Sequence, residues 1–452
     1  MGRAIRFAAA LLCLTCGTSA VMGQGLIVPS AGPINSAMAG ASTAAPIEFG
    51  SSYWNPANIS ALSNQEFLLG SALILPDISL QSTIPARSIL GQFPTTTRFG
   101  ESRSSSGVGS NLATGTSFRL APDSDWTFGI GVFGLAGGGV NFAGSSSQPI
   151  LAPHRPPKYL GVGPIYSNIS LLGINPMASC QVTDQLAIGG GPVITSSTAN
   201  FDPAFFASSS GPLGLPTFAS ATNSHPFWGG GFQLGLLYEL NEDWNLGFSY
   251  KSPIWQQRWD YNASYPDKSA RQIGIQAQIP AIYSWGVAYK GLERALFDVD
   301  LRYIDYANAE LFGQKVSDGG LGWRSVFAVA LGAQYAVTDR LTLRAGYLFN
   351  TNPIPAPVTL FNMQAPAITE HTLSLGASYS VTENITCSFA WVHGFDNSIQ
   401  GSILQIPGSS VRLTTQTDSI LAGLNFKFGG PRKRAPTIPA LPEEVAAAQP
   451  AD

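Results

Sequence analysis

Residue types that carry out catalysis or bind metals are sparse and scattered in this chain of 452 residues. The four histidines, His154, His225, His371 and His393, stand alone, without the close spacing typical of metal ligands. No Gly-x-Ser-x-Gly elbow is present, and no phosphate- or dinucleotide-binding glycine loop follows a predicted strand. We therefore expect a protein that is not an enzyme and has no metal or cofactor, although a dispersed site in a barrel would leave no motif.

The composition excludes most soluble and helical membrane folds. Charged residues make up 11% of the chain, whereas about 25% is usual in soluble proteins. The chain contains 49 glycines and 32 prolines, a high number for a helical fold, and aromatic residues make up 11% of its residues. After the export signal, no run approaches the roughly 18 consecutive apolar residues of a transmembrane helix. This combination is typical of a transmembrane β-barrel, and the net charge of −3 gives no reason to expect nucleic acid.

The first 23 residues have the pattern of an export signal. Two arginines precede an apolar run from Phe7 to Leu14, and small residues follow. A lipoprotein interpretation of Cys16 is disfavoured because the residues before it do not match the signal for lipidation. Removal of residues 1–23 would leave Cys180 and Cys387, so the cysteines do not form a disulfide framework.

Short polar turns and alternating residues predict β-hairpins. The turns lie at 121–125, 182–185, 240–243, 291–294, 337–340 and 381–384. After the third turn, Trp244, Leu246 and Phe248 share one face, and small or polar residues stand between them. Bulky apolar residues on one face and glycine, serine or charged residues on the other indicate lipid outside and a lumen inside. A soluble β-sandwich also alternates, but its inner face would not be the polar one.

The count of turns predicts 14 antiparallel strands. Six turns join 12 strands, one strand precedes them at 65–75, and one follows them at 418–428. An even number is typical of bacterial barrels, which place short turns in the periplasm and long loops outside. The long connections are 76–110, 136–166, 197–226, 256–278, 308–323, 351–369 and 396–416. Both termini of the chain would then lie in the periplasm.

Several motifs resemble one family of outer-membrane proteins. They are 36–41 (SAMAGA), 53–57 (YWNPA), 248–254 (FSYKSPI), 279–280 (IP), 343–347 (LRAGY) and the Asp300/Tyr303 pair. Together they resemble the long-chain fatty acid and aromatic hydrocarbon transporters (OMPP1/FadL/TodX) from residue 26 to residue 428. The resemblance implies a monomeric, all-β, 14-stranded antiparallel barrel in the bacterial outer membrane, with a small N-terminal hatch inside the lumen.

This resemblance and the strand pattern together suggest four segments. We expect a signal peptide at 1–23, a hatch at 24–64, the barrel at 65–428 and a periplasmic, disordered Pro/Ala-rich tail at 429–452. Fourteen strands lie between small filled barrels and open porins, so their lumen requires a plug. Asn55, Pro56 and Ala57 would belong to the hatch, although Asn-Pro is also an ordinary turn. The tail is either simply disordered or a site for a periplasmic partner.

The resemblance also implies a route for hydrophobic molecules. Family members are expected to release them laterally into outer-membrane lipid at an inward kink of the third strand. The residues that would form this kink are Phe133, Gly134, Gly137, Gly138 and Gly139. Glycines within a strand favour bulges and bends. The same run could instead be a flexible start of the second long loop.

Two groups of side chains are candidate binding residues in such a transporter. The resemblance implies an apolar capture groove between the third and fourth outer loops, which here carry Phe201, Phe205, Phe206, Phe218, Trp255 and Trp259. Packing of the loops against each other would explain the same residues. Lys251 and Arg344 face the lumen by alternation, and either could bind a carboxylate. Each could instead pair with Asp298 or Asp300 in the wall.

Three functions remain open at this point. The preferred one is diffusive uptake of long-chain fatty acids or similar lipidic compounds by loop capture, a lumen pocket, hatch movement and lateral release. The first alternative is uptake of aromatic hydrocarbons by the same route. The second is a general porin for polar solutes, which the low charge and the predicted hatch disfavour.

Overall fold

A computed structural model describes residues 23–89, 91–155, 159–207, 217–222, 225–265, 267–403 and 406–430. The expected signal peptide and the Pro/Ala-rich tail lie outside these residues, except for Gly23, Gly429 and Gly430. No helix in the described ranges is both long and apolar enough to cross a membrane.

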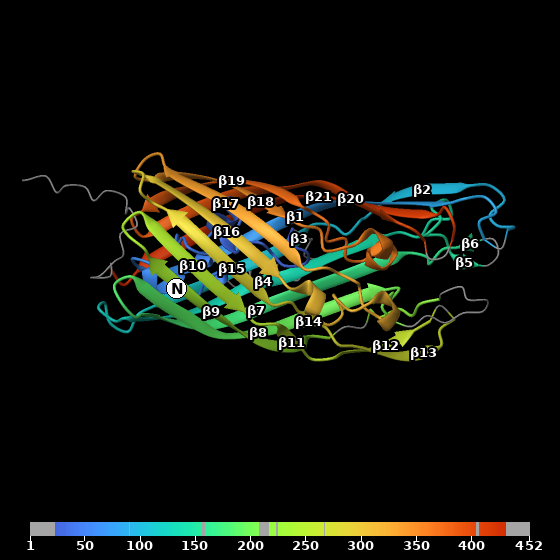
Figure 1. Cartoon of the computed structure of the whole chain (residues 1–452), viewed down its shortest axis with the longest axis horizontal. Helices are drawn as coiled ribbons and strands as arrows, with labels where there is room; N and C mark the ends of the chain where they lie inside the picture. Colours follow the sequence, from blue (N-terminus) through green and yellow to red (C-terminus); the bar gives the residue numbers. More distant parts are fainter. Residues whose placement is uncertain are drawn as a thin grey trace, which may run out of the picture.

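The architecture is a closed antiparallel barrel of 14 strands, so the predicted fold class is confirmed (Figure 1). In order around the barrel the strands are β1 (Gln65–Ile84), β3 (Gly109–Phe118), β4 (Trp126–Phe142), β7 (Ile165–Gln181), β8 (Leu186–Asp202), β9 (Phe227–Glu239), β10 (Trp244–Lys251) continued by β11 (Ile254–Gln256), β14 (Gln278–Ile279) continued by β15 (Ile282–Tyr289), β16 (Ala295–Ile304), β17 (Val326–Ala336), β18 (Leu341–Asn350), β19 (His371–Thr382), β20 (Ile385–Gly401) and β21 (Ser410–Phe428). The barrel closes where β1 pairs with β21, from Gln65↔Phe428 to Thr83↔Ser410.

Alternation along each strand separates a lipid-facing surface from the lumen. On β16, Phe297 and Leu301 are exposed, whereas Asp298 and Asp300 between them are buried. Hydrocarbon offers no partner for backbone N–H and C=O groups, so a spanning sheet must close on itself. The exposed apolar side chains therefore form the surface in contact with lipid.

Several strands are longer than the sequence pattern predicted. β1 has 20 residues and reaches Ile84, and β21 begins at Ser410. At about 3.4 Å per residue, strands of this length exceed a hydrocarbon core of about 30 Å even when tilted by about 45°. Their outer ends need no apolar face, because they extend beyond the lipid, and apolar alternation could not reveal them.

The outer connections contain further short elements. They are β2 (Arg98–Arg103), β5 (His154–Arg155), β6 (Tyr159–Leu160), β12 (Trp259–Ser264), β13 (Ala270–Ile275), η3 (Tyr306–Asn308), η4 (Val316–Asp318) and η5 (Ala356–Asn362). β2 extends the sheet beside the outer half of β1, and β12 pairs with β13 as a hairpin. The predicted fourth long loop is therefore largely a two-stranded ribbon.

The N-terminal residues before β1 pack against the inward face of the strands. They contain α2 (Gly32–Ala37), η1 (Phe49–Tyr53) and α3 (Asn58–Ala61), and almost every residue from 23 to 62 is buried. Inward-facing glycines allow their close approach. A Cβ on Gly346 would lie less than 3.0 Å from the Met38 backbone, and one on Gly247 equally close to Thr43. That this segment moves as a hatch stays a prediction.

Candidate functional site

Two largely apolar cavities lie next to each other beside the N-terminal segment. The inner cavity is lined by Phe133, Leu135, Gln233, Lys251, Ile254 and Ile282, among others. The outer cavity includes Leu171, Phe201, Phe206, Trp259, Phe312 and Phe361 in its lining. Ile279 contributes to both linings, and Leu26 and Ile27 of the N-terminal segment line one each. The two cavities are therefore neighbours along the lumen.

A bulge between β10 and β11 sets which side chains face the inner cavity. Lys251 pairs with Gln233 of β9, whereas Trp255 pairs with Gly230, so one extra residue stands on the β10–β11 side. Ser252 Oγ accepts a hydrogen bond from Phe232 N at 2.9 Å. A bulge redirects the side chains that follow it. Lys251 and Ile254 consequently both face inward.

A second bulge interrupts the barrel wall in β4. The pairing of β4 with β7 shifts register between Gly134 and Ala136, and its pairing with β3 ends at Phe133. Beyond this point the N-terminal segment takes over part of the bonding, because Val28 N donates to Leu135 O at 2.9 Å and Gly137 N donates to Leu26 O at 3.3 Å. The glycine-rich run is thus strand rather than loop. A lateral opening here stays a prediction.

The six expected capture residues do not form one group. Phe201, Phe206 and Trp259 line the outer cavity. The rings of Phe205 and Phe218 pack against each other with centroids 5.1 Å apart. Trp255 is 53% exposed on β11, because the bulge turns it toward lipid. The structure therefore separates Trp255 from the loop cluster in which the sequence placed it.

Sequence reasoning missed the contribution of the fifth and sixth outer connections. Phe312 follows η3, and Phe361 lies on η5, and both line the outer cavity. Gln364 Nε2 donates to Tyr166 O at 2.8 Å, which ties the sixth connection to β7. Apolar residues in these connections were the available signal, but nothing local in the sequence shows that they fold back over the lumen.

The two lumen cations have different surroundings. Arg344 Nε donates to Gln334 Oε1 at 2.8 Å and Nη1 donates to Ser378 Oγ at 2.6 Å, and the residue lines neither cavity. Lys251 Nζ lies 3.8 Å from the ring centre of Tyr53 and faces the inner cavity. No ion pair among the described residues includes Lys251. Lys251 is therefore the better placed of the two to bind a ligand.

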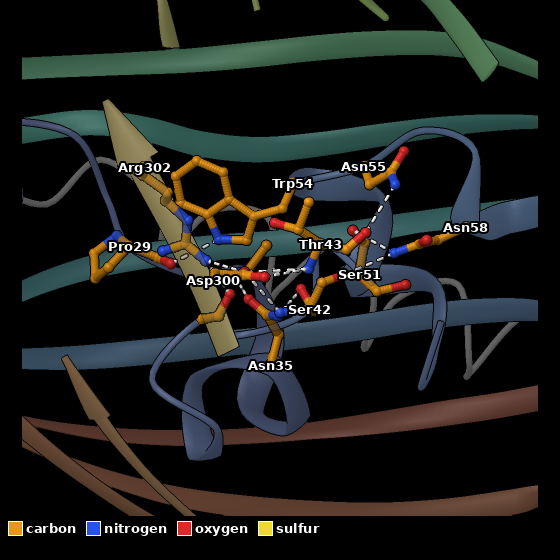
Figure 2. Close-up of polar contacts among 12 residues, drawn as sticks. Pro29, Asn35, Ser42, Thr43, Ser51, Trp54, Asn55, Asn58, Asp300 and Arg302 are labelled. Atoms are coloured by element: carbon orange, nitrogen blue, oxygen red, sulfur yellow. Dashed lines mark hydrogen bonds and ion pairs between the residues drawn. The ribbon is translucent and has the colours of Figure 1, made fainter. Parts of the chain in front are cut away.

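Asp300, one of the two aspartates expected as alternative partners, binds other groups, and neither aspartate forms an ion pair with Lys251 or Arg344 among the described residues. Asp300 Oδ2 forms an ion pair with Arg302 Nη2 at 2.6 Å and accepts hydrogen bonds from Ser42 N at 3.0 Å and Thr43 N at 3.1 Å (Figure 2). Arg302 also lies over the Trp54 ring, 3.7 Å from its centre. Because an unpaired buried charge is costly, this cluster fixes the N-terminal segment to β16.

The Asn-Pro-Ala triplet forms a second attachment. Asn55 is fully buried, and its Nδ2 donates to Thr43 O at 2.8 Å (Figure 2). The same Nδ2 also donates to Leu236 O of β9 at 2.9 Å. Its Oδ1 accepts from Ala57 N at 3.0 Å, which closes a turn around Pro56. The triplet therefore makes a turn and also binds the wall.

No group of three or more histidine, cysteine or acidic side chains in the described ranges could hold a metal ion.

Comparison with known proteins identifies the family. Residues 12–429 match the family model described as outer membrane protein transport protein (OMPP1/FadL/TodX). The chain belongs to this family. It is accordingly a β-barrel of the bacterial outer membrane. Solved structures with the same fold support this assignment of the fold. A Pseudomonas aeruginosa FadL homologue superimposes with a TM-score of 0.69 at 16% identity, over 90% of this chain and 100% of that one. The Pseudomonas putida toluene transporter TodX superimposes with a TM-score of 0.63 at 19% identity, over 90% of this chain and 99% of that one.

Curated relatives match over a shorter region. A 47 kDa outer membrane protein of Pasteurella multocida is 25% identical over 44% of this chain and 50% of its own length. A long-chain fatty acid transport protein of Salmonella typhi is 20% identical over 44% of this chain and 49% of its own length. The chain thus spans about half the length of the curated relatives that it matches.

Proposed function

We propose that this protein mediates diffusive uptake of long-chain fatty acids, or of similar lipidic compounds, across the outer membrane. The observation that carries the proposal is the inner cavity, where the ammonium group of Lys251 faces a largely apolar lining and no carboxylate of the described residues pairs with it. A long apolar ligand with one anionic end complements such a cavity. The name of the Salmonella typhi relative supports the same substrate class.

The proposed route begins at the outer cavity and ends in lipid. Phe201, Phe206 and Trp259 capture the ligand, which then passes Leu26 and Ile27 into the inner cavity as the N-terminal segment moves. Burying each methylene gains about 0.8 kcal/mol, so release of a 16-carbon chain into water would cost roughly 12 kcal/mol. Lateral release into the bilayer avoids that cost. The place where β4 no longer pairs with β3 is therefore the proposed exit.

Uptake of aromatic hydrocarbons is the second candidate function. The outer cavity favours it, because its lining contains five aromatic rings and no charged side chain. The likeness to the toluene transporter TodX shows the fold alone. A general porin is less favoured, because the buried N-terminal segment occupies the interior of the barrel.

Uptake by whole cells tests these functions. Cells that lack their own hydrophobic-compound transporters would express the full chain, and accumulation of radiolabelled oleate, toluene and a polar sugar would be compared with an empty-vector control. We expect faster accumulation of oleate, no effect on the sugar, and loss of the oleate effect in Lys251→Met. Equal stimulation of all three solutes would contradict the proposal, and stimulation of toluene alone would support the second candidate.

A further inference from the structure

The side chain opposite Lys251 has a buried donor with nothing to bind. Gln233 on β9 is the direct cross-strand partner of Lys251 on β10, and it also lines the inner cavity. The side chain is 3% exposed, and its amide nitrogen Nε2 has no hydrogen-bond partner. Buried amide groups are rarely left in this state, because an unmade hydrogen bond is costly. Such an orphan beside a cavity indicates that the missing acceptor belongs to a ligand.

A second buried glutamine, on the neighbouring segment β11, shows the ordinary arrangement. Gln256 on β11 donates from Nε2 to Thr195 Oγ1 at 2.8 Å and accepts from Ser197 Oγ at 3.0 Å. Both ends of that amide are therefore satisfied by the wall itself. The contrast with Gln233 shows that this barrel can satisfy a buried glutamine through its neighbouring strands. Gln233 differs from Gln256 in that the wall leaves its amide nitrogen without a partner at the edge of the inner cavity.

Lys251 is held in place beside Gln233. Its Nζ lies 3.8 Å from the ring centre of Tyr53 and 4.6 Å from that of Trp54. Cation–π contacts of this kind position an ammonium without neutralising its charge. Directly opposed residues of an antiparallel pair have Cβ atoms about 5 Å apart. An ammonium group and an amide N–H at this spacing can both reach the two oxygens of one carboxylate.

We propose that Gln233 determines specificity by donating from Nε2 to one oxygen of a carboxylate whose other oxygen binds Lys251 Nζ. This inference rests on the proposed uptake of lipidic compounds and names their end group. Val193, Ile254 and Ile282 of the same lining would contact the first methylenes. A long-chain alcohol offers one uncharged acceptor, and an alkane offers none. The inner cavity should therefore select fatty acids over neutral chains of equal length.

Two substitutions at this position test the proposal. Gln233→Leu removes the donor, and Gln233→Glu keeps the side-chain shape but places a negative charge beside Lys251. The full-length barrel would be reconstituted into liposomes, and equilibrium binding of radiolabelled oleate and oleyl alcohol would be measured. A hydrogen bond to a charged group is equivalent to about 10- to 100-fold in affinity. We expect each variant to lower the preference for oleate over oleyl alcohol by at least about 10-fold.

Gln256→Leu is the matched control, since it also removes a buried glutamine of the wall. It should weaken the binding of oleate and of oleyl alcohol by the same factor and leave the preference unchanged. An unchanged oleate preference in Gln233→Leu or Gln233→Glu would overturn the inference while leaving the proposed function intact. Wild-type protein that binds neither ligand would instead contradict the proposed function. Folding of each variant is checked by the shift of the barrel on unheated gels. If Gln233→Leu does not fold, Gln233→Glu alone tests the inference.

Discussion

The attachment of the N-terminal segment to β16 can be tested by removing Asp300. This fully buried carboxylate accepts hydrogen bonds from Ser42 N and Thr43 N and pairs with Arg302. Removing one partner of a buried ion pair costs about 3–5 kcal/mol, because the other charge is left uncompensated. We therefore expect Asp300→Ala to favour local release of the N-terminal segment by roughly 100- to 3,000-fold, since each 1.4 kcal/mol is a factor of ten.

Hydrogen exchange is the assay that separates local release from loss of the barrel. In Asp300→Ala the amides of Ser42 and Thr43 should exchange faster by about that factor, whereas amides in the middle of β16 should remain protected. Asp298→Asn is the matched control, because Asp298 is equally buried on the same strand, whereas the ion pair with Arg302 is formed by Asp300. That control should change exchange at Ser42 and Thr43 by less than about tenfold. Wild-type exchange rates in Asp300→Ala would refute the view that Asp300 fixes the segment.

Three further predictions concern packing, the exit and the first residues of the N-terminal segment. Gly346→Val should destabilise the barrel by about 1–3 kcal/mol, measured by urea unfolding, because its new side chain would overlap the Met38 backbone. Gly137→Val combined with Gly138→Val should reduce oleate uptake several-fold without changing the gel shift of the folded barrel, because the added side chains would obstruct the exit proposed beside β4. Tyr306→Phe should speed exchange at Leu26 N, since the Tyr306 hydroxyl accepts that hydrogen bond at 2.9 Å.

Each of these has an outcome that would contradict it. Gly230→Val is the control for overlap at Gly346, because a Cβ at Gly230 meets nothing within 4 Å. Equal stability losses in the two valine variants would show that loss of glycine, rather than overlap, is responsible. Undiminished oleate uptake in the double variant would argue against an exit at β4. Slow exchange at Leu26 N in Tyr306→Phe would show that other contacts hold the first residues.

The strand number was predictable because lipid imposes the same rule on every strand. A residue such as Leu301 must face hydrocarbon while Arg302 beside it faces the lumen, so turns and alternation locate strands within the membrane. This constraint ends at the membrane surface. The outer half of β1 and the β12–β13 hairpin therefore escaped prediction, and so did the return of Phe361 over the lumen.

The candidate site was predictable only in part, because its contacts join residues far apart in the chain. Alternation placed Lys251 in the lumen, but Tyr53 approaches it only through the path of the N-terminal segment. Asp300 binds an amide 258 positions away. The one-residue bulge after Lys251 turned Trp255 from the expected capture loop to the lipid face. A slip of one residue reverses every later side chain, and only the paired strands reveal it.

Inward-facing glycines were the unused sequence signal for where the N-terminal segment lies. Gly247 pairs with Gly286, Gly332 with Gly346, and Gly70 with Gly423 across neighbouring strands. Glycine weakens an isolated strand and leaves no side chain to pack, so matched inward pairs need a compensating partner. Here that partner is the N-terminal segment. A Cβ at Gly247, Gly286 or Gly346 would lie less than 3.0 Å from its backbone, and a Cβ at Gly332 would lie less than 3.0 Å from the Met38 side chain. Alternation combined with strand pairing would thus have located the part of the wall against which the N-terminal segment packs, before any contact was known.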